Sequence, residues 1–130
     1  MSPRQGGVLL IGSLVFVVIT LFEQIPLVGW LGAFVSLAAW IWLAGEVRRA
    51  GGTAIDAAVA GGVTGVVGAV SAWMLQVGNL LGPDTPGLAR FGAGLGTIGA
   101  SVFLVIWPLV GAFVCGGAAA LRARRYAAGR

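Results

Sequence analysis

Long apolar runs separated by short polar breaks dominate the pattern of the chain. Apolar residues fill approximately residues 6–25, 27–45, 54–81 and 88–121, and polar or turn-forming residues gather between these runs. A helix rises about 1.5 Å per residue, so about 20 residues are needed to cross about 30 Å of hydrocarbon. The pattern predicts an all-α integral membrane protein, a bundle of four transmembrane helices in a single domain that covers residues 1–130.

The breaks between the runs indicate how the helices pair. Pro26 separates the first two runs, because the residue before a proline is pushed away from helical angles. The segment GPDTPG, residues 82–87, has the composition of a turn and places Pro86 in the first turn of the last helix. These breaks predict two helical hairpins. The stretch EQIP after the first run lacks the small-x-small cleavage pattern of a signal peptide, so we expect this run to remain as a span.

Two local signals refine the third and fourth helices. Thr53 and Asp56 have the spacing of a capping box, which places Thr53 at the start of the third helix. Asp56 then lies in the first turn, near the positive end of the helix dipole. In the fourth run, Pro108 removes the backbone hydrogen bond to the carbonyl of Leu104 and is expected to kink the helix.

Composition supports a membrane protein and leaves little material for catalysis. Of the 130 residues, 58% are hydrophobic and only 9% are charged, whereas soluble domains carry about 25% charged residues. The chain has no histidine, which excludes imidazole ligands for haem or zinc and imidazole acid–base catalysis. Its one cysteine, Cys115, excludes an internal disulfide and is interpreted as a packing residue. We therefore expect no enzymatic activity, no cofactor and no metal site.

The positive charges indicate an orientation in the membrane. With four spans, one side carries Arg4, Arg48, Arg49, Arg122, Arg124, Arg125 and Arg130, whereas the other carries only Arg90. By the positive-inside rule, both termini are predicted to be cytoplasmic. The arginines at 48, 49, 122, 124 and 125 are expected to set topology and to attract anionic lipid headgroups. Because they lie only between and after apolar runs, they do not predict a nucleic-acid partner.

The tryptophans form part of a predicted aromatic belt. Trp30 and Trp73 are expected near the outer membrane interface, and Trp40 and Trp42 near the inner one. Trp107 lies in the middle of the fourth span and does not fit the belt.

Small residues recur at intervals of three and four in the third and fourth runs. These predicted helix-packing positions are Gly61, Gly65, Gly68 and Ala72 in the third run and Gly92, Gly96, Gly99 and Ala100 in the fourth. Small residues on one face let helix backbones approach closely in lipid. We expect the two stripes to lie against each other first. The stripes are compatible with packing inside one four-helix unit, with self-association, or with a backbone lining for a ligand path.

A few polar residues gather near the predicted outer end. Glu23 and Gln24 follow the first apolar run, and Gln76 and Asn79 lie on adjacent turns of the third. Glu23 is either a turn residue that faces water or, with Gln24, the mouth of a cation path. No ionisable residue is expected at mid-depth, where such groups are functional candidates.

The stretch IPLVGWLGAFVSLAAWIWLAGEVRRAGGTAIDAAVAGGVTGVVGAV resembles small glycine-rich, four-helix membrane proteins of unknown function in prokaryotes. The resemblance implies a hairpin marked by proline, a short basic loop and a glycine-rich third helix, and it supplies no catalytic residues. Small multidrug transporters share the size and the four spans but carry a glutamate within the first span, whereas Glu23 lies at its end.

The preferred functional interpretation is an accessory or structural subunit. In it, the glycine-rich faces pack against other transmembrane helices, in a larger complex or a homo-oligomer, and the lipid bilayer is the other partner. The alternative is a small homo-oligomeric channel or transporter. A membrane enzyme ranks third.

Overall fold

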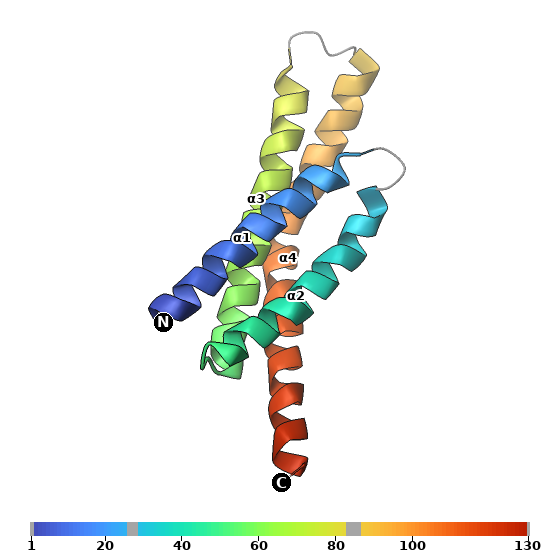
Figure 1. Cartoon of the computed structure of the whole chain (residues 1–130). Helices are drawn as coiled ribbons and strands as arrows, with labels where there is room; N and C mark the ends of the chain where they lie inside the picture. Colours follow the sequence, from blue (N-terminus) through green and yellow to red (C-terminus); the bar gives the residue numbers. More distant parts are fainter. Residues whose placement is uncertain (1, 26–28, 83–86, 130) are drawn as a thin grey trace.

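Four long helices, arranged as two hairpins, form the described part of the protein (Figure 1). The computed structural model of the chain describes residues 2–25, 29–82 and 87–129. The helices are α1 (Pro3–Glu23), α2 (Gly32–Arg49), α3 (Ala54–Leu81) and α4 (Gly87–Ala128), and a short 3-10 helix, η1 (Gly29–Leu31), precedes α2. Each long helix has the length and apolar composition needed to cross a membrane. The all-α, four-helix prediction is therefore confirmed, and the helices indicate a membrane protein.

The start of α3 follows the predicted sequence signal. The hydroxyl of Thr53 accepts a hydrogen bond from the Asp56 N–H at 3.2 Å, and the Asp56 carboxylate accepts one from the Thr53 N–H at 2.7 Å. The predicted capping box is therefore present. A second box, between Ser2 and Gln5, starts α1. The predicted breaks at Pro26 and in the turn that contains Pro86 lie outside the described residues.

The second helix differs from its predicted range of 27–45 at both ends. The 3-10 helix η1 comes first, and α2 then continues to Arg49. Gly51, with a φ of +83°, terminates it, because glycine adopts this left-handed conformation without steric cost. In the last turn, Glu46 and Arg49 form an ion pair on the surface.

The last helix is long enough to reach beyond a bilayer. α4 has 42 residues, which corresponds to about 63 Å at 1.5 Å per residue. It continues past the predicted end at residue 121 and includes Arg122, Arg124 and Arg125. Pro108 lies inside the helix without interrupting it, and α4 changes direction near its middle in Figure 1, as expected of a proline kink.

The α1–α2 hairpin packs against the α3–α4 hairpin, and, among the described residues, contacts join every pair of the four long helices except α1 and α4. The two ends of the chain and the connection from α2 to α3 lie toward one end of the molecule, called here the lower end (Figure 1). The upper parts of α3 and α4 extend beyond the α1–α2 hairpin. The α3–α4 pair has the most extensive contact.

An aromatic cluster lies in the core between the hairpins. Trp40 of α2 is fully buried, and its ring lies 5.1 Å from that of Phe16 on α1 and 5.0 Å from that of Trp107 on α4. Its indole N–H donates to the hydroxyl of Thr64 on α3 at 3.1 Å. The prediction that Trp40 belongs to an interfacial belt is therefore wrong. A large ring contributes most when buried, provided that its N–H finds an acceptor, as it does here.

Small residues bring α3 and α4 into backbone contact beside this cluster. A Cβ added to Gly65 would lie 2.7 Å from the Cα of Pro108. A Cβ added to Gly61 would overlap the carbonyl oxygen of Gly111 and lie 2.6 Å from the Cβ of Cys115. We call this contact between the helices the seam; it consists of Gly61, Gly65, Pro108, Gly111 and Cys115. Cys115 is fully buried in it, in agreement with its interpretation as a packing residue.

The seam corrects the predicted contact between the two glycine stripes. The expected partner of Gly61 and Gly65 was the stripe at residues 92–100, but these glycines meet a later part of α4. The helices are antiparallel, so the first half of α3 lies beside the second half of α4. At Gly92 and Gly99, an added Cβ would meet nothing within 4 Å. A packing role for those two glycines requires a second chain and stays a prediction.

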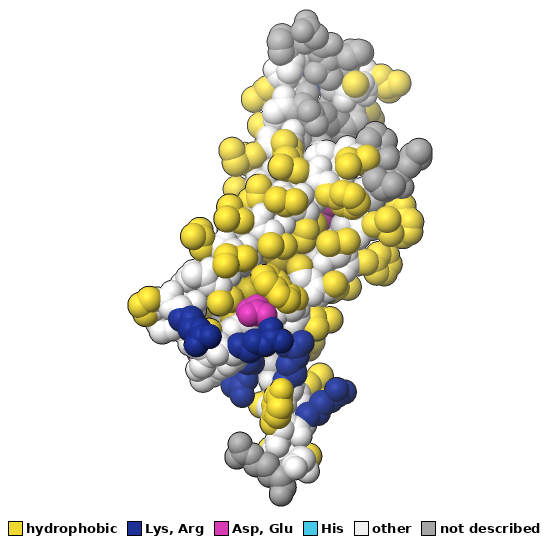
Figure 2. Space-filling model, in the orientation of Figure 1, with side chains coloured by type: hydrophobic (Ala, Val, Ile, Leu, Met, Phe, Trp, Pro, Cys, Tyr) yellow, Lys and Arg dark blue, Asp and Glu magenta, His cyan; other side chains and the backbone are white. Residues whose placement is uncertain are grey.

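Arginine side chains gather at the lower end of the molecule (Figure 2). They come from the start of α1, the end of α2 and the end of α4. Among the described residues, one arginine lies elsewhere: Arg90, near the start of α4. Positive charge is therefore concentrated at one end of the bundle.

Candidate functional site

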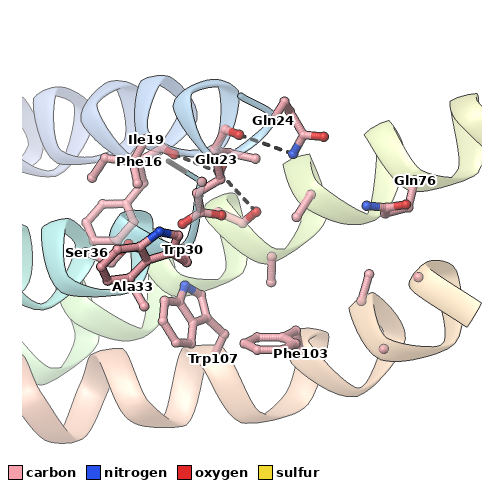
Figure 3. Close-up of a pocket in the computed structure, with 18 residues that line it drawn as sticks. Phe16, Ile19, Glu23, Gln24, Trp30, Ala33, Ser36, Gln76, Phe103 and Trp107 are labelled. Carbon is pink, nitrogen blue, oxygen red and sulfur yellow. Dashed lines mark hydrogen bonds between the residues drawn. The ribbon is translucent and has the colours of Figure 1, made fainter. Parts of the chain in front are cut away.

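A cleft of about 470 Å³ opens between the two hairpins above the aromatic cluster. The end of α1, η1 with the start of α2, and the upper parts of α3 and α4 form its walls, and Figure 3 shows the lining side chains. A volume of this size falls within the range of about 300–1,000 Å³ of small-molecule sites. The lining residues are Phe16, Ile19, Thr20, Glu23, Gln24, Gly29, Trp30, Ala33, Ser36, Gly68, Ala69, Ala72, Gln76, Gly96, Gly99, Ala100, Phe103 and Trp107.

Glu23 is the charged residue of this cleft. It ends α1, is half-buried, and its side chain folds over Gly32 at the start of α2. A Cβ at Gly32 would overlap the Glu23 side chain, so the glycine provides the room that the carboxylate occupies. The first N–H groups of a helix carry partial positive charge, which favours an anionic side chain at this place.

Two amide side chains lie in the same cleft. Gln24 donates through its side-chain nitrogen to the carbonyl of Thr20 at 3.4 Å. Gln76 lies against α4, where an added Cβ at Gly96 would be 2.8 Å from its Oε1. The structure therefore brings together Glu23, Gln24 and Gln76, three of the four residues of the predicted polar mouth. The fourth side chain, that of Asn79, lies outside the described part of the chain.

Aromatic rings form the side of the cleft opposite the carboxylate. Phe103 and Trp107 of α4 have ring centroids 5.4 Å apart and face α1 and α2 in Figure 3. Trp107 also contacts Trp40, so the cleft wall is continuous with the core. Trp30 of η1 adds a mostly exposed indole at the rim.

The lining carries one formal charge, and that charge is negative. Among the described residues that line the cleft, Glu23 is the only ionisable one. Its carboxylate makes no hydrogen bond or ion pair with any residue in the described ranges. Those ranges also contain no cluster of metal-ligating side chains. The arrangement offers a carboxylate, two amides and aromatic faces to a molecule that enters the cleft.

Sequence reasoning missed the aromatic half of this site. The sequence signals assign no role to Trp107 and do not distinguish Phe103 from other apolar residues of the fourth run. Both lie one turn apart on α4, directly after the small stripe that ends at Ala100. The available signal was two aromatic residues four positions apart, which lie on one face of a helix, preceded by small residues that leave space beside that face. Gly68 and Ala72 of the α3 stripe line the same hollow.

A second, shallow groove lies between α3 and α4 and is lined only by apolar and glycine residues. It has a volume of about 670 Å³ and runs beside the seam, over Ala58, Gly62 and Ala112. Because no polar group converges on it, nothing in its lining selects a ligand.

No known protein-family model matches the chain, and neither does any curated protein or solved structure. The functional argument therefore depends on the geometry of the described residues.

Proposed function

We propose that the protein is a non-enzymatic integral membrane protein that serves as an accessory or structural subunit. In this proposal, the exposed glycine face on the upper half of α4 packs against transmembrane helices of another chain, in a homo-oligomer or a larger membrane complex. The bilayer is the remaining partner.

The observation that carries this proposal is the contrast between the seam and the upper half of α4. In the seam, glycines are covered by the opposite helix. Gly92 is exposed, and an added Cβ there would meet nothing within 4 Å. Large apolar side chains flank it, among them Leu88 and Phe91, which are 85% and 66% exposed. In lipid, apolar side chains need no protein partner, but glycine faces favour close helix contact.

The proposed location is a prokaryotic plasma membrane with both termini in the cytoplasm. Support comes from the arginines at the lower end, which include Arg48, Arg49, Arg122, Arg124 and Arg125. Arginines concentrate on the cytoplasmic side of membrane proteins and attract anionic headgroups there.

Molecular mass in a mild detergent, measured by light scattering after extraction from the native membrane, tests the assembly. We expect the wild-type chain to run as an oligomer or with a second protein. Gly92→Leu should reduce it to a monomer, because the added side chain blocks close helix approach. Gly117→Leu is the matched control, since Gly117 is exposed on the lower half of the same helix and an added Cβ there also meets nothing within 4 Å.

A strictly monomeric wild-type protein with no co-purifying chain would contradict the proposal, and so would a Gly92→Leu variant that assembles normally. Gly65→Leu is unsuitable for this experiment. Its Cβ would lie 2.7 Å from the Cα of Pro108, so the change damages the fold of the chain itself.

The second candidate function is a small homo-oligomeric channel or transporter. It is favoured by the convergence of Glu23, Gln24 and Gln76 on one cleft. Ion flux into liposomes that contain the purified protein tests it, and Glu23→Gln should then change the selectivity. Absence of flux from oriented, folded protein would remove this candidate.

A further inference from the structure

We propose that the cleft between the hairpins binds a monovalent organic cation with an apolar, preferably aromatic, body. This inference goes beyond the assembly role, because it assigns a ligand site within one chain. The juxtaposition that carries it is the Glu23 carboxylate on one side of the cleft and the Trp107 and Phe103 rings on the other.

The charge of the lining selects the sign of the ligand. Glu23 is half-buried among apolar walls and has no hydrogen-bond or ion-pair partner in the described ranges. A carboxylate removed from water without a partner is costly, and a cation that enters the cleft offsets that cost. An anion would meet only this negative charge, since none of the described lining residues is positive.

The aromatic rings select an organic cation over a metal ion. A cation within about 6 Å of an indole or phenyl ring centroid is attracted by the ring quadrupole, and the attraction grows when the site is desolvated. Trp107 and Phe103 supply two such rings, and Trp30 supplies a third at the rim. A hard divalent cation instead requires about six or more oxygen ligands. The lining offers one carboxylate and the amides of Gln24 and Gln76 in a mainly carbon surface.

The size and the small-residue wall suit an apolar body. The cleft holds about 470 Å³. Gly99 and Ala100 leave the α4 wall flat above Phe103, so a ring can lie against the helix. Ala33 and Ala72 do the same on α2 and α3. The occupant is therefore a compact cation with its charge directed to Glu23 and its rings directed to α4.

A pair of probes that match in shape and differ in charge tests the inference. Binding of tetraphenylphosphonium to the full-length protein in detergent is measured by equilibrium dialysis, and tetraphenylborate is the anion of similar size and shape. We expect saturable binding of the cation and at least tenfold weaker binding of the anion. Equal affinity for both probes, or no saturable binding of the cation, would overturn the inference.

Glu23→Gln isolates the carboxylate while keeping the shape of the side chain. It should weaken cation binding by about tenfold or more and leave the anion unaffected or slightly favoured. Glu46→Gln is the matched control, because it removes a carboxylate at the lower end, far along α2 from the cleft, and should leave the affinity unchanged. Thermal unfolding of each variant shows whether the fold is kept.

Trp107→Leu tests the aromatic wall but also touches the core, so Trp30→Leu at the rim is the safer variant. We expect a loss of severalfold in affinity for Trp30→Leu and none for Phe113→Leu, since Phe113 is 84% exposed on α4 and does not line the cleft. Unchanged affinity in both Glu23→Gln and Trp30→Leu would overturn the site. These results are independent of Gly92→Leu, because Gly92 does not line the cleft.

Discussion

The lower and upper halves of the α3–α4 pair are both rich in glycine, and they use it in different ways. In the lower half, Gly61 of α3 and Gly111 of α4 lie so close that neither has room for a Cβ. In the upper half, Gly92 and Gly99 of α4 have no atom within 4 Å of an added Cβ. The lower half therefore forms a closed seam, whereas the upper half leaves a cleft and an exposed face.

The difference shows that a stripe of glycines does not determine a contact by itself. The seam forms where small residues occur on both helices at matching heights, with Cys115 and Pro108 of α4 completing the surface that Gly61 and Gly65 meet. Above the seam, the α4 stripe faces Gln76 and open space. Complementarity between two surfaces, and not glycine content, decides which helices touch.

The largest expected effect comes from placing the same side chain in the two halves. Gly61→Leu should lower the free energy of unfolding by about 3 kcal/mol or more, because the new side chain has to push α3 and α4 apart. Gly92→Leu should change it by less than about 0.5 kcal/mol, as expected of an exposed site without neighbours. Unfolding in mixed micelles, in a detergent that keeps both variants monomeric, measures this. Equal losses in the two variants would break the distinction between seam and exposed face.

A smaller effect is expected from two pairs of tryptophan and hydroxyl groups. The buried pair joins Trp40 to Thr64 at 3.1 Å, and the exposed pair, higher on the bundle, joins Trp73 to Ser101 at 3.2 Å. Thr64→Val should cost about 1 kcal/mol, because it leaves the indole N–H of Trp40 buried without its acceptor. Ser101→Ala should cost less than about 0.5 kcal/mol, since solvent or headgroups can replace the hydroxyl.

A double-mutant cycle between Thr64→Val and Trp40→Phe sharpens this comparison. We expect a coupling energy of at least about 0.6 kcal/mol, the average found for hydrogen bonds between membrane helices, and no more than about 1.7 kcal/mol, the maximum found. No coupling, or an effect of Ser101→Ala as large as that of Thr64→Val, would mean that burial does not distinguish the two pairs.

The smallest effect is expected at the charged surface of the two ends. Glu46→Ala removes the ion pair with Arg49 at the lower end and should cost less than about 0.5 kcal/mol. Arg90→Ala removes a long hydrogen bond of 3.5 Å to the Gly82 carbonyl near the upper end and should cost no more. Thermal unfolding of both variants against the wild type measures this. A decrease of more than about 1 kcal/mol in the free energy of unfolding of either variant would mean that the surface charges contribute to stability on the scale expected of the seam.

Much of the architecture follows from local sequence signals. The length of the apolar runs predicted four helices, and the Thr53–Asp56 spacing predicted the start of α3, because both depend on residues near one another in the chain. The predicted end of α2, residue 45, lies four residues before the observed end, because the charged segment marks the end of the apolar run and not the end of the helix. Arg49 instead lies in the last helical turn, where positive charge is favourable, and Gly51 ends the helix beyond it.

The pairing of helices could not be predicted in the same way. Placing Gly65 opposite Pro108 requires the relative height of two helices, which depends on a connection that apolar periodicity does not describe. The burial of Trp40 has the same origin. A tryptophan is assigned to the aromatic belt from its distance to the end of its own helix. Trp40 is buried because residues of three other helices, α1, α3 and α4, pack around it.

Part of the cleft was accessible from the sequence. Glu23 and Gln76 were grouped because both were expected near the same end of the bundle, and the structure places both in the cleft. The opposite wall was not accessible, because the position of Trp107 in the middle of the fourth span does not show which side of that helix faces the other hairpin. The structure places its ring on the side of α4 that meets Trp40 and lines the cleft.

Pro108 stands at the point where the seam ends and the cleft wall begins. Below it, α4 is clamped to α3 by backbone contact, and above it the helix carries Trp107, Phe103 and Gly99 along the hollow. At this point the carbonyl of Leu104 lacks its usual backbone donor, so the helix is least stiff there. A bend of α4 at Pro108 would therefore change the width of the cleft while the contacts of the seam below it stay in place.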